Sequence, residues 1–301
     1  MNVIAIVGPT ASGKSALALR AAERTGGEIV SADSRQVYRG MDIGTAKPTP
    51  EEQRRVRHHC IDLVEPGTPY DAARYQTAAR AALSEIARRG HIAYVVGGTG
   101  LYVGALLDGL AFDAAPTDPL LRASLEARAS VEGGAALHQE LAGIDPAAAE
   151  RVDPRNTRRV VRYLELATLA GRVPGERRER ISCLRVGLDP PRAWLDERIT
   201  ARVRQMVVDG VLPETAHLVE RGIDPALPSM SAHGYVHWAA HLRGELTLET
   251  AIQATAKDVR AYSRRQLTWF RRDRDIRWVD PLTTDPLSLL DHLDHPEHAA
   301  V

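Results

Sequence analysis

The sequence has few cysteines, no long apolar segment and almost no lysine. Only two cysteines, Cys60 and Cys183, occur in 301 residues, which leaves no cysteine set for zinc and is typical of a reducing cytoplasm. No apolar run approaches the length needed to span a membrane, and residues 1–7 lack the basic flank of a signal peptide. We therefore expect a cytoplasmic protein without a membrane segment.

The chain also lacks a net charge. The 39 basic residues balance 39 acidic ones, so a nucleic-acid partner would have to be bound by local basic patches and not by an overall positive field. Only three of the basic residues are lysines, namely Lys14, Lys47 and Lys257. Because lysine and arginine are not chemically interchangeable, each retained lysine marks a position of interest.

The first third of the chain alternates short apolar runs with helical patterns. The apolar runs cover residues 3–7, 28–32 and 92–96, and the helical patterns cover residues 16–24 and 72–89. Such alternation predicts an α/β fold, with a parallel sheet flanked by helices. Since parallel sheets bind ligands beyond the carboxyl ends of their strands, the loops after Val7, Ala32 and Val96 are candidate site loops.

The middle of the chain predicts a helical insertion. After Phe112 the strand pattern gives way to helical spacing over residues 118–171, which is interrupted at Gly133-Gly134 and Asp145-Pro146. A strand-like run at 183–188 and an amphipathic segment ending at Gly210 then follow. The expected domains are a P-loop core (first part) at 1–112, a helical insertion at 113–181, and a return to the core with C-terminal helices at 182–301.

The loop after the first apolar run is a phosphate-binding motif. Its residues are Gly8, Pro9, Thr10, Ala11, Ser12, Gly13, Lys14 and Ser15, and they match the P-loop at every fixed position. Backbone N–H groups at the start of the following helix would point at an anion, Lys14 would supply positive charge, and Ser15 could hold magnesium. The motif predicts diphosphate or triphosphate binding but does not identify the reaction, because many enzyme classes share it.

Two further loops place reactive groups at the same edge of the predicted sheet. Asp33 follows the second strand, where a carboxylate could ligate magnesium or accept a proton from a nucleophile. Thr99 follows the third strand, and the glycines beside it allow the backbone to approach a ligand closely. Alternatively, Asp33 and Thr99 could each cap a helix.

With these loops in view, the sequence resembles the tRNA dimethylallyltransferases. That family isopentenylates the adenosine 3′ of the anticodon in tRNAs that read codons beginning with U. The resemblance covers nearly the whole chain, and a P-loop kinase would share only its first segment. The matching segments are residues 8–15, SADSRQVY at 31–38, DIGTAKP at 42–48, VGGTGLY at 96–102, NTRRVVRYLE at 156–165 and YSRRQLTWFR at 262–271.

The resemblance implies a substrate, a cofactor and a partner. Dimethylallyl diphosphate and Mg²⁺ would bind at residues 8–15, with tRNA as the acceptor, and nothing in the sequence demands more than a monomer. The implied catalytic residues are Lys14, Asp33 as general base, Thr99, and Arg202 at the leaving diphosphate. The implied tRNA-binding residues are Asp33, Ser34, Arg35 and Gln36, together with Arg158, Arg159, Val160, Val161 and Arg162 of the insertion.

These residue types suit prenyl transfer to an adenine. The adenine amine is a poor nucleophile, so its proton must leave as the new bond forms, and Asp33 suits that step. Negative charge grows on the departing diphosphate, where Lys14, Arg202, magnesium and the loop amides would stabilise it. A base inside an anticodon stem-loop must also be extruded, and Gln36 could read its edge once it is flipped.

The C-terminal region is basic and also departs from the family. Seven basic residues in 257–274 are interleaved with three aromatic ones, which suits RNA phosphates and bases but is also typical of a solvated amphipathic helix. Where the family usually shows Ile-Gly-Tyr and a basic residue, this chain has His233-Gly234-Tyr235-Val236. Val259 likewise replaces a usual threonine. The resemblance therefore gives no support for RNA contacts from residues 233–236.

Three other functions fit parts of the sequence. An isopentenyltransferase could use a free adenine nucleotide, a P-loop small-molecule kinase could use Asp33 as base for a hydroxyl acceptor, and a nucleotide-regulated RNA-binding protein would need no chemistry. The helical insertion and the arginine-rich C-terminal segment favour tRNA as the acceptor.

Overall fold

The computed structural model describes residues 2–110, 117–173, 180–225, 227–230 and 234–289. It divides the chain into two compact units, one formed by residues 1–108 with 181–301 and the other by residues 109–180. The second unit begins at 109 where the sequence suggested 113, and ends at 180 where it suggested 181.

The first unit contains a six-stranded parallel sheet with the order β3-β2-β4-β1-β5-β6, so the predicted α/β class is confirmed. Its strands are β1 (Val3–Val7), β2 (Glu28–Ser31), β3 (His58–His59), β4 (Ala93–Gly97), β5 (Leu184–Leu188) and β6 (Ile276–Val279). Every residue of β1 and β4 is buried, as expected for central strands that are covered on both faces. These strands therefore appear in the sequence as continuous apolar runs.

The sequence did not predict β3 and β6. Strand β3 has only two residues, both histidines, and β6 buries Ile276 and Val279 while Arg277 is exposed. Both strands lie at the edges of the sheet, where less of each strand is covered. Their apolar pattern is correspondingly weak.

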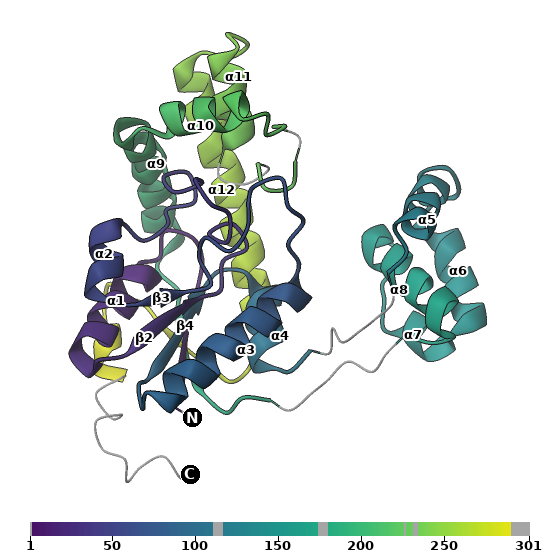
Figure 1. Cartoon of the computed structure of the whole chain (residues 1–301), viewed down its shortest axis with the longest axis horizontal. Helices are drawn as coiled ribbons and strands as arrows, with labels where there is room; N and C mark the ends of the chain where they lie inside the picture. The colour runs from purple at the N-terminus through teal and green to yellow at the C-terminus, as the bar shows by residue number, and fades with distance from the viewer. Residues whose placement is uncertain (1, 111–116, 174–179, 226, 231–233, 290–301) are drawn as a thin grey trace. The chain divides into compact units, whose positions relative to one another are not determined.

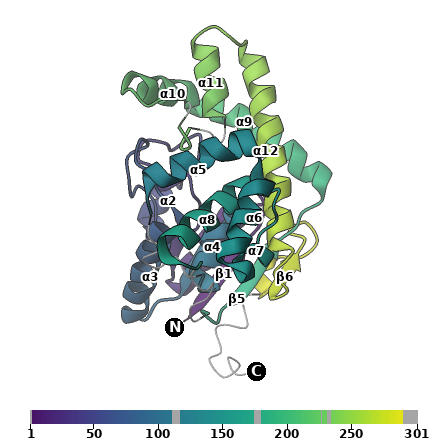
Figure 2. The same cartoon turned by 90° about the vertical axis from the view of Figure 1, so that its right-hand side faces the viewer.

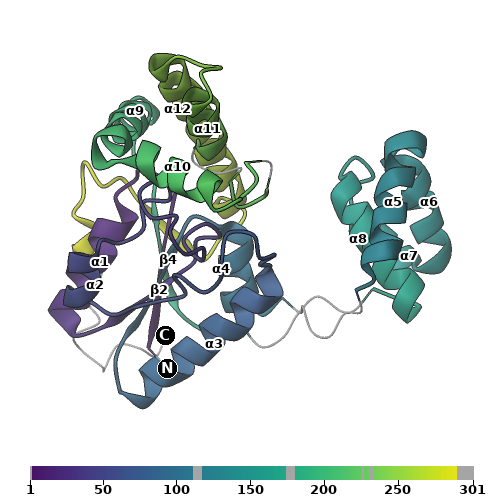
Figure 3. The same ribbon diagram turned by 45° about the horizontal axis from the view of Figure 1, so that its top comes forward.

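Helices cover both faces of the sheet. Helix α1 (Lys14–Thr25) packs on one face, and α3 (Ala72–Arg88) and α4 (Gly100–Leu107) pack on the other (Figure 3). Leu17 and Ala18 of α1 share a buried cluster with Ile4 and Ile6 of β1. The short α2 (Pro50–Arg55) precedes β3 and begins with a capping box. The loops after β1, β2 and β4 are thereby brought to one edge of the sheet.

Beyond that edge lie α9 (Arg192–Asp209), α10 (Val211–Glu220) and α11 (Tyr235–Leu242) (Figure 1). Helix α9 ends at the predicted Gly210, which has a φ of 104°. The long α12 (Leu248–Phe270) packs against α11, α9 and α4 and leads to β6 (Figure 2), and a short 3-10 helix, η1 (Pro286–Leu289), follows. No helix in the described ranges is long and apolar enough to cross a membrane.

The second unit is a helical bundle. It comprises α5 (Pro119–Glu132), α6 (Gly134–Ile144), α7 (Pro146–Glu150) and α8 (Thr157–Ala170). The helix breaks predicted at Gly133 and Asp145 are confirmed. The unit has its own core, in which Leu137, Leu141 and Leu164 are fully buried. The chain leaves the first unit shortly after Leu107 and returns to it at Ile181. These two residues are hydrogen-bonded to each other, since the Ile181 N–H donates to the Leu107 carbonyl at 2.9 Å.

Candidate active site

The P-loop connects β1 to α1 and has the backbone of an anion cradle. Gly8, Ala11 and Gly13 all have positive φ angles, of 147°, 69° and 96°. A Cβ on Gly8 would lie 2.9 Å from the Leu188 carbonyl oxygen, so this position requires glycine. The first N–H groups of α1 have no partners within the helix and lie at the positive end of its dipole. This is an anion-binding arrangement.

Only part of the loop is available to a ligand. The Thr10 N–H donates to Oε1 of Gln266 at 2.8 Å, and the Pro9 carbonyl accepts from Lys14 Nζ at 3.1 Å. The hydroxyl of Ser12 is buried and has no hydrogen-bond partner among the described residues. A buried hydroxyl without a partner is costly, and an oxyanion bound in the cradle would supply one.

A cavity of about 1000 Å³ lies over the P-loop. Gly13, Lys14 and Ser15 form part of its lining. Its walls also include Ser31 at the end of β2, Gln36 in the turn that follows, and residues between Asp42 and Pro50. Helix α9 contributes Arg198, Arg202 and Met206. The cavity is large enough for a small diphosphate ester and for part of an acceptor.

Three of the predicted catalytic residues lie close enough for their charges to interact. Burial lowers the pKa of Lys14 to about 8; the negative charge of Asp33 opposes this effect and the positive charge of Arg202 adds to it. Burial also lowers the pKa of Arg202, against the raising effect of Asp33, and Arg198 lowers it further. Lys14 and Arg202 both lose hydration in this site. A polyanionic ligand would compensate for that loss by pairing with their charges.

Asp33 and Thr99 are joined through Ser34. The Thr99 Oγ1 accepts the Ser34 N–H at 3.0 Å and donates to the Ser34 hydroxyl at 3.3 Å. The Asp33 Oδ1 accepts the Arg35 N–H at 2.8 Å in a turn. The capping alternative is wrong for Asp33, because no helix begins after it. Thr99 does occupy the N-cap position of α4, but its side chain makes no cap bond and is used for Ser34 instead.

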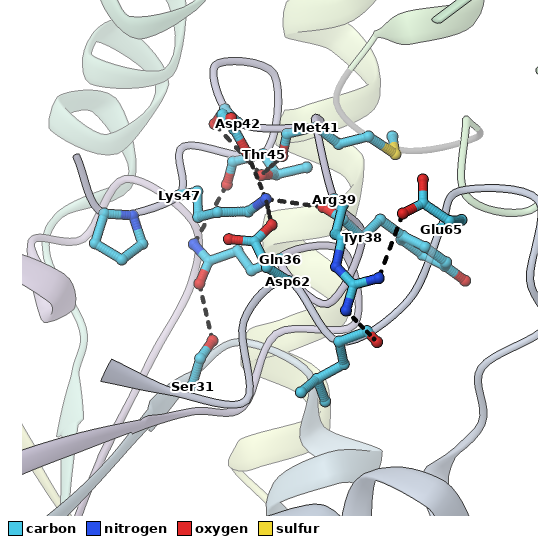
Figure 4. Close-up of polar contacts among 12 residues, drawn as sticks. Ser31, Gln36, Tyr38, Arg39, Met41, Asp42, Thr45, Lys47, Asp62 and Glu65 are labelled. Carbon is cyan, nitrogen blue, oxygen red and sulfur yellow. Dashed lines mark hydrogen bonds and ion pairs between the residues drawn. The ribbon is translucent and has the colours of Figure 1, made fainter. Parts of the chain in front are cut away.

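Gln36 lines the cavity with both ends of its amide engaged. Its Oε1 accepts from the Ser31 hydroxyl at 2.8 Å (Figure 4). Its Nε2 donates to the Ala46 carbonyl at 3.0 Å. Its Nε2 also lies 3.5 Å from the Thr45 carbonyl. To read a base edge, Gln36 would have to exchange one of these bonds. Arg35 is half-buried and donates from Nη1 to the Pro228 carbonyl at 2.5 Å.

Lys47 fixes the loop that walls the cavity. Its Nζ donates to the Tyr38 carbonyl at 2.8 Å and pairs with Asp42 at 2.5 Å and with Asp62 at 2.6 Å (Figure 4). The lysine side chain is only 2% exposed. A charge so deeply buried is stable only when it is paired and fully hydrogen-bonded, so this lysine organises the loop.

Arg198 is a site residue that the sequence analysis missed. It lies one helical turn before Arg202 on α9 and lines the same cavity. Its Nε donates to the Ala11 carbonyl at 3.3 Å, and its guanidinium lies 4.6 Å from the centre of the Trp194 ring. The spacing of two arginines four residues apart on one helix was the available signal.

The predicted tRNA-binding segment of α8 separates into surface and core residues. Arg158 and Arg159 are exposed, and Arg162 is half-buried and pairs with the buried Glu165 at 2.7 Å. Val160 and Val161 are 0% and 2% exposed and belong to the core of the second unit. Any RNA contact by side chains of this segment therefore falls to the arginines.

Helix α12 is amphipathic, which was one of the two interpretations of the basic and aromatic residues in 257–274. Ser263, Gln266 and Phe270 are buried. The opposite side bears a groove of about 460 Å³ lined by Arg264, Arg265, Arg272, Ala261, Thr268 and Trp269. Trp269 remains 45% exposed. Arg264, Arg265 and Arg272 thus lie along one groove, where phosphates could reach them.

The parallel sheet, the glycine-rich loop between β1 and α1, and the cations over that loop define an enzyme fold of the P-loop class. Two family models match the chain. One described as IPP transferase matches residues 36–273, and one described as isopentenyl transferase matches residues 1–65. The chain belongs to the tRNA dimethylallyltransferase family, as the resemblance in its sequence predicted.

Similar proteins match over almost their whole length. A tRNA dimethylallyltransferase of Anaeromyxobacter dehalogenans is 51% identical over 288 residues, which covers 93% of this chain and 95% of that protein. The tRNA dimethylallyltransferase of Thermomicrobium roseum is 48% identical, covering 92% of this chain and 86% of that protein.

Solved structures agree with this assignment. The tRNA isopentenylpyrophosphate transferase of Bacillus halodurans is 40% identical, with a TM-score of 0.71 over 97% of this chain and 94% of that one. A eukaryotic dimethylallyltransferase acting on tRNA is 26% identical, with a TM-score of 0.74 over 97% of this chain and 76% of that one. The kinase alternative finds no support among these relatives.

Proposed function

We propose that this protein transfers the dimethylallyl group of dimethylallyl diphosphate to N6 of the adenosine 3′ of the anticodon, in tRNAs that read codons beginning with U. Diphosphate is the second product. The observation that carries the proposal is the gathering of Lys14, Asp33 and Arg202 at a P-loop in a chain of this family. These residues supply the two functions that the reaction needs, namely a base and an anion-stabilising cluster.

The P-loop side of the cavity binds the donor. In the reaction the bond between C1 of the dimethylallyl group and the diphosphate oxygen breaks, and the electron pair leaves with the diphosphate. Lys14, Arg198 and Arg202 lie where that charge develops, together with the first N–H groups of α1. Preorganised cations and dipoles of this kind lower the barrier because they need little reorganisation during the step.

The site fits magnesium held mainly by the substrate. Ser15 offers a hydroxyl oxygen to the cavity, and the described residues contain no cluster of three histidine, cysteine or acidic side chains that could hold a metal alone. Mg²⁺ commonly takes one or two protein oxygens and completes its shell with phosphate oxygens and water. Bound there, it would neutralise charge on the diphosphate.

Asp33 receives the proton of the acceptor. As N6 forms its bond to C1, it loses a proton, which Asp33 takes as general base. The bond from the Arg35 N–H to Oδ1 orients the carboxylate, which keeps free lone pairs for the proton. Thr99 holds Ser34, the next residue in the chain, and thereby fixes the direction of the carboxylate.

The acceptor is the anticodon stem-loop of tRNA. Gln36 lines the cavity and Asp33 lies within electrostatic range of Lys14 and Arg202. The exposed arginines of α8 and α12 offer phosphate contacts that a free nucleotide would not use. We propose that the protein acts as a monomer in the cytoplasm. The free-nucleotide enzyme is the second candidate, and the relatives do not favour it.

A labelling experiment tests this function. Purified protein is incubated with Mg²⁺ and labelled dimethylallyl diphosphate, and with either an unmodified anticodon stem-loop RNA or AMP. Label in RNA alone supports the proposal, whereas label in AMP alone moves the protein to free nucleotides, and label in neither acceptor refutes prenyl transfer. The Asp33→Asn variant keeps the shape but not the base, and its kcat should fall by about 10²- to 10⁴-fold.

A further inference from the structure

The side chain of Gln266 bridges two loops of the site. Its Oε1 accepts the Thr10 N–H of the P-loop at 2.8 Å, and its Nε2 donates to the Gly98 carbonyl at 3.0 Å. Gln266 is 3% exposed and is 256 positions from Thr10 in the sequence. The two loops follow the neighbouring strands β1 and β4. One of them forms the diphosphate cradle, and the other carries Thr99.

The contact between Gln266 and the Gly98 backbone leaves no room for a side chain at position 98. A Cβ on Gly98 would lie 2.1 Å from Nε2 of Gln266, so the backbone of this loop meets the amide directly. One backbone group to be satisfied is a donor and the other an acceptor. A glutamine amide satisfies both, a glutamate lacks the donor, and a methionine of similar length lacks strong hydrogen-bonding groups.

Tyr262 extends the bridge to the reacting groups. It lies one turn before Gln266 on α12 and interacts with both Thr99 and Gln266. Burial raises the pKa of Tyr262 and the charge of Asp33 adds to this effect, while the contacts with Thr99 and Gln266 lower it. Tyr262 is therefore within electrostatic range of the proposed base. Helix α12 holds the cradle and the Thr99 loop from one side.

We propose that Gln266 is a positioning residue that sets the distance between the diphosphate cradle and Thr99, with Tyr262 acting beside it. This inference rests on the proposed function, because the spacing matters where a donor in the cradle must meet an acceptor beside Asp33. A displacement of about 1 Å in reacting groups can slow an enzyme about a hundredfold. Gln266 acts through Thr10 and Gly98, so its loss should slow the reaction without weakening RNA binding.

The decisive variant is Gln266→Met, with Gln76→Met as a matched control. Gln76 is also a buried helical glutamine that donates to a backbone carbonyl, that of Ala105, at 2.5 Å. We expect the single-turnover rate of Gln266→Met to fall at least about tenfold, while Kd for the stem-loop RNA stays within about twofold. Gln76→Met should lose some thermal stability and keep its rate.

Tyr262→Phe tests whether the two residues act together. It should also slow turnover, and the double variant with Gln266→Met should lose less than the product of the two single losses, because coupled residues are not additive. A rate for Gln266→Met within about twofold of the unaltered protein would overturn the proposal. An equal loss of rate in Gln76→Met would overturn it too, since general destabilisation would then explain both.

Donor binding separates this proposal from the function itself. Calorimetric titration with dimethylallyl diphosphate and Mg²⁺ needs no acceptor and no turnover. Weaker binding by Gln266→Met than by Gln76→Met would support the bridge even if the unaltered protein failed to label RNA, in which case the proposed function alone would fall. Identical titrations of the two variants, together with an absence of RNA labelling, would count against both.

Discussion

The hydroxyl of Tyr235 donates a 2.6 Å hydrogen bond to Oε1 of Glu214. The same carboxylate accepts the backbone N–H groups of Asp42, Ile43 and Gly44, at 2.8, 2.8 and 3.0 Å. The tyrosine ring also covers Gly44, where a Cβ would lie 2.5 Å from its Cζ. Helices α10 and α11 thus hold the loop that walls the cavity.

This arrangement accounts for the part of the 233–236 segment that the structure describes. Tyr235 is fully buried and serves the loop, while Val236 is 42% exposed and offers no charge to a phosphate. His233 lies outside the described residues. The resemblance gave no support for RNA contacts from this segment. The packing role of Tyr235 agrees with that interpretation.

Removing the Glu214 carboxylate should loosen the cavity wall. Glu214→Ala leaves three backbone donors and one hydroxyl without their acceptor, so we expect a loss of about 1–3 kcal/mol in the free energy of unfolding and a raised KM for the donor. Tyr235→Phe removes one bond only and should cost about 1 kcal/mol. Urea denaturation and steady-state kinetics measure both effects. An unchanged KM in Glu214→Ala would show that the wall does not depend on this carboxylate.

Donor affinity should depend on pH through Lys14. The pKa of this residue is lowered to about 8 by burial, and a bound diphosphate favours its charged form. Affinity is therefore fully present below pH 8 and falls as pH rises above it, by up to about tenfold per pH unit for one proton. Calorimetric titration with dimethylallyl diphosphate across this range measures the effect. Lys14→Arg keeps its charge and should show a flat profile, whereas an equal slope in both proteins would assign the dependence to another group.

Glu28, at the start of β2, should contribute to stability in a pH-dependent way. Burial raises the pKa of its carboxylate, but hydrogen bonds from Arg89, His59 and His91 outweigh burial and lower the pKa from 4.5 to about 2. Because the folded-state pKa is the lower one, this stabilisation is present above pH 4.5 and is lost as pH falls towards 2.

The Glu28→Gln variant should therefore be less stable by about 3 kcal/mol at neutral pH, and the difference should shrink in acid. Urea denaturation at several pH values measures it. Glu85 provides the control, since it pairs with the same Arg89 at 3.6 Å but is 49% exposed. Glu85→Gln should cost less than about 1 kcal/mol. A pH-independent difference for Glu28→Gln would contradict the proposed linkage.

The arginines of α12 should bind RNA by their charge. Arg264 and Arg265 are exposed and line the groove beside Trp269. Replacing both with glutamine should weaken binding of the stem-loop RNA and reduce the slope of log Kd against log salt by about two. Filter binding between about 50 and 200 mM salt measures the slope. The exposed Arg243, paired with Glu245 at 2.6 Å, is the control. A slope unaltered in the double variant would remove this face from the RNA interface.

Local signals in the sequence were sufficient for the central sheet and the cradle. Strands β1 and β4 are buried on both faces and appear as apolar runs, and the glycines of the P-loop have positive φ angles that their residue type favours. The edge strands β3 and β6 lack such a pattern because they are only partly covered. Sequence patterns therefore predict what burial and backbone geometry impose locally.

Contacts between distant segments could not be predicted in this way. Nothing near Gln266 indicates that its amide binds Thr10, because that contact depends on how α12 packs across the site. Val160 and Val161 were included with their arginine neighbours in a continuous tRNA-binding segment, although the helical period turns both valines into the core. Arg198 was not predicted, although it lies in the same helix as Arg202, which the resemblance to the family had indicated.

The bond between Ile181 and Leu107 has a consequence for how such a chain can change over time. It closes the whole 109–180 segment as a single loop on the core. The entropy of closing a loop grows only with the logarithm of its length, by about 0.6 kcal/mol for each doubling. The helical unit can thus grow, shrink or be exchanged at little thermodynamic cost to the sheet, so evolution can reshape this unit while the P-loop and the residues around it stay fixed.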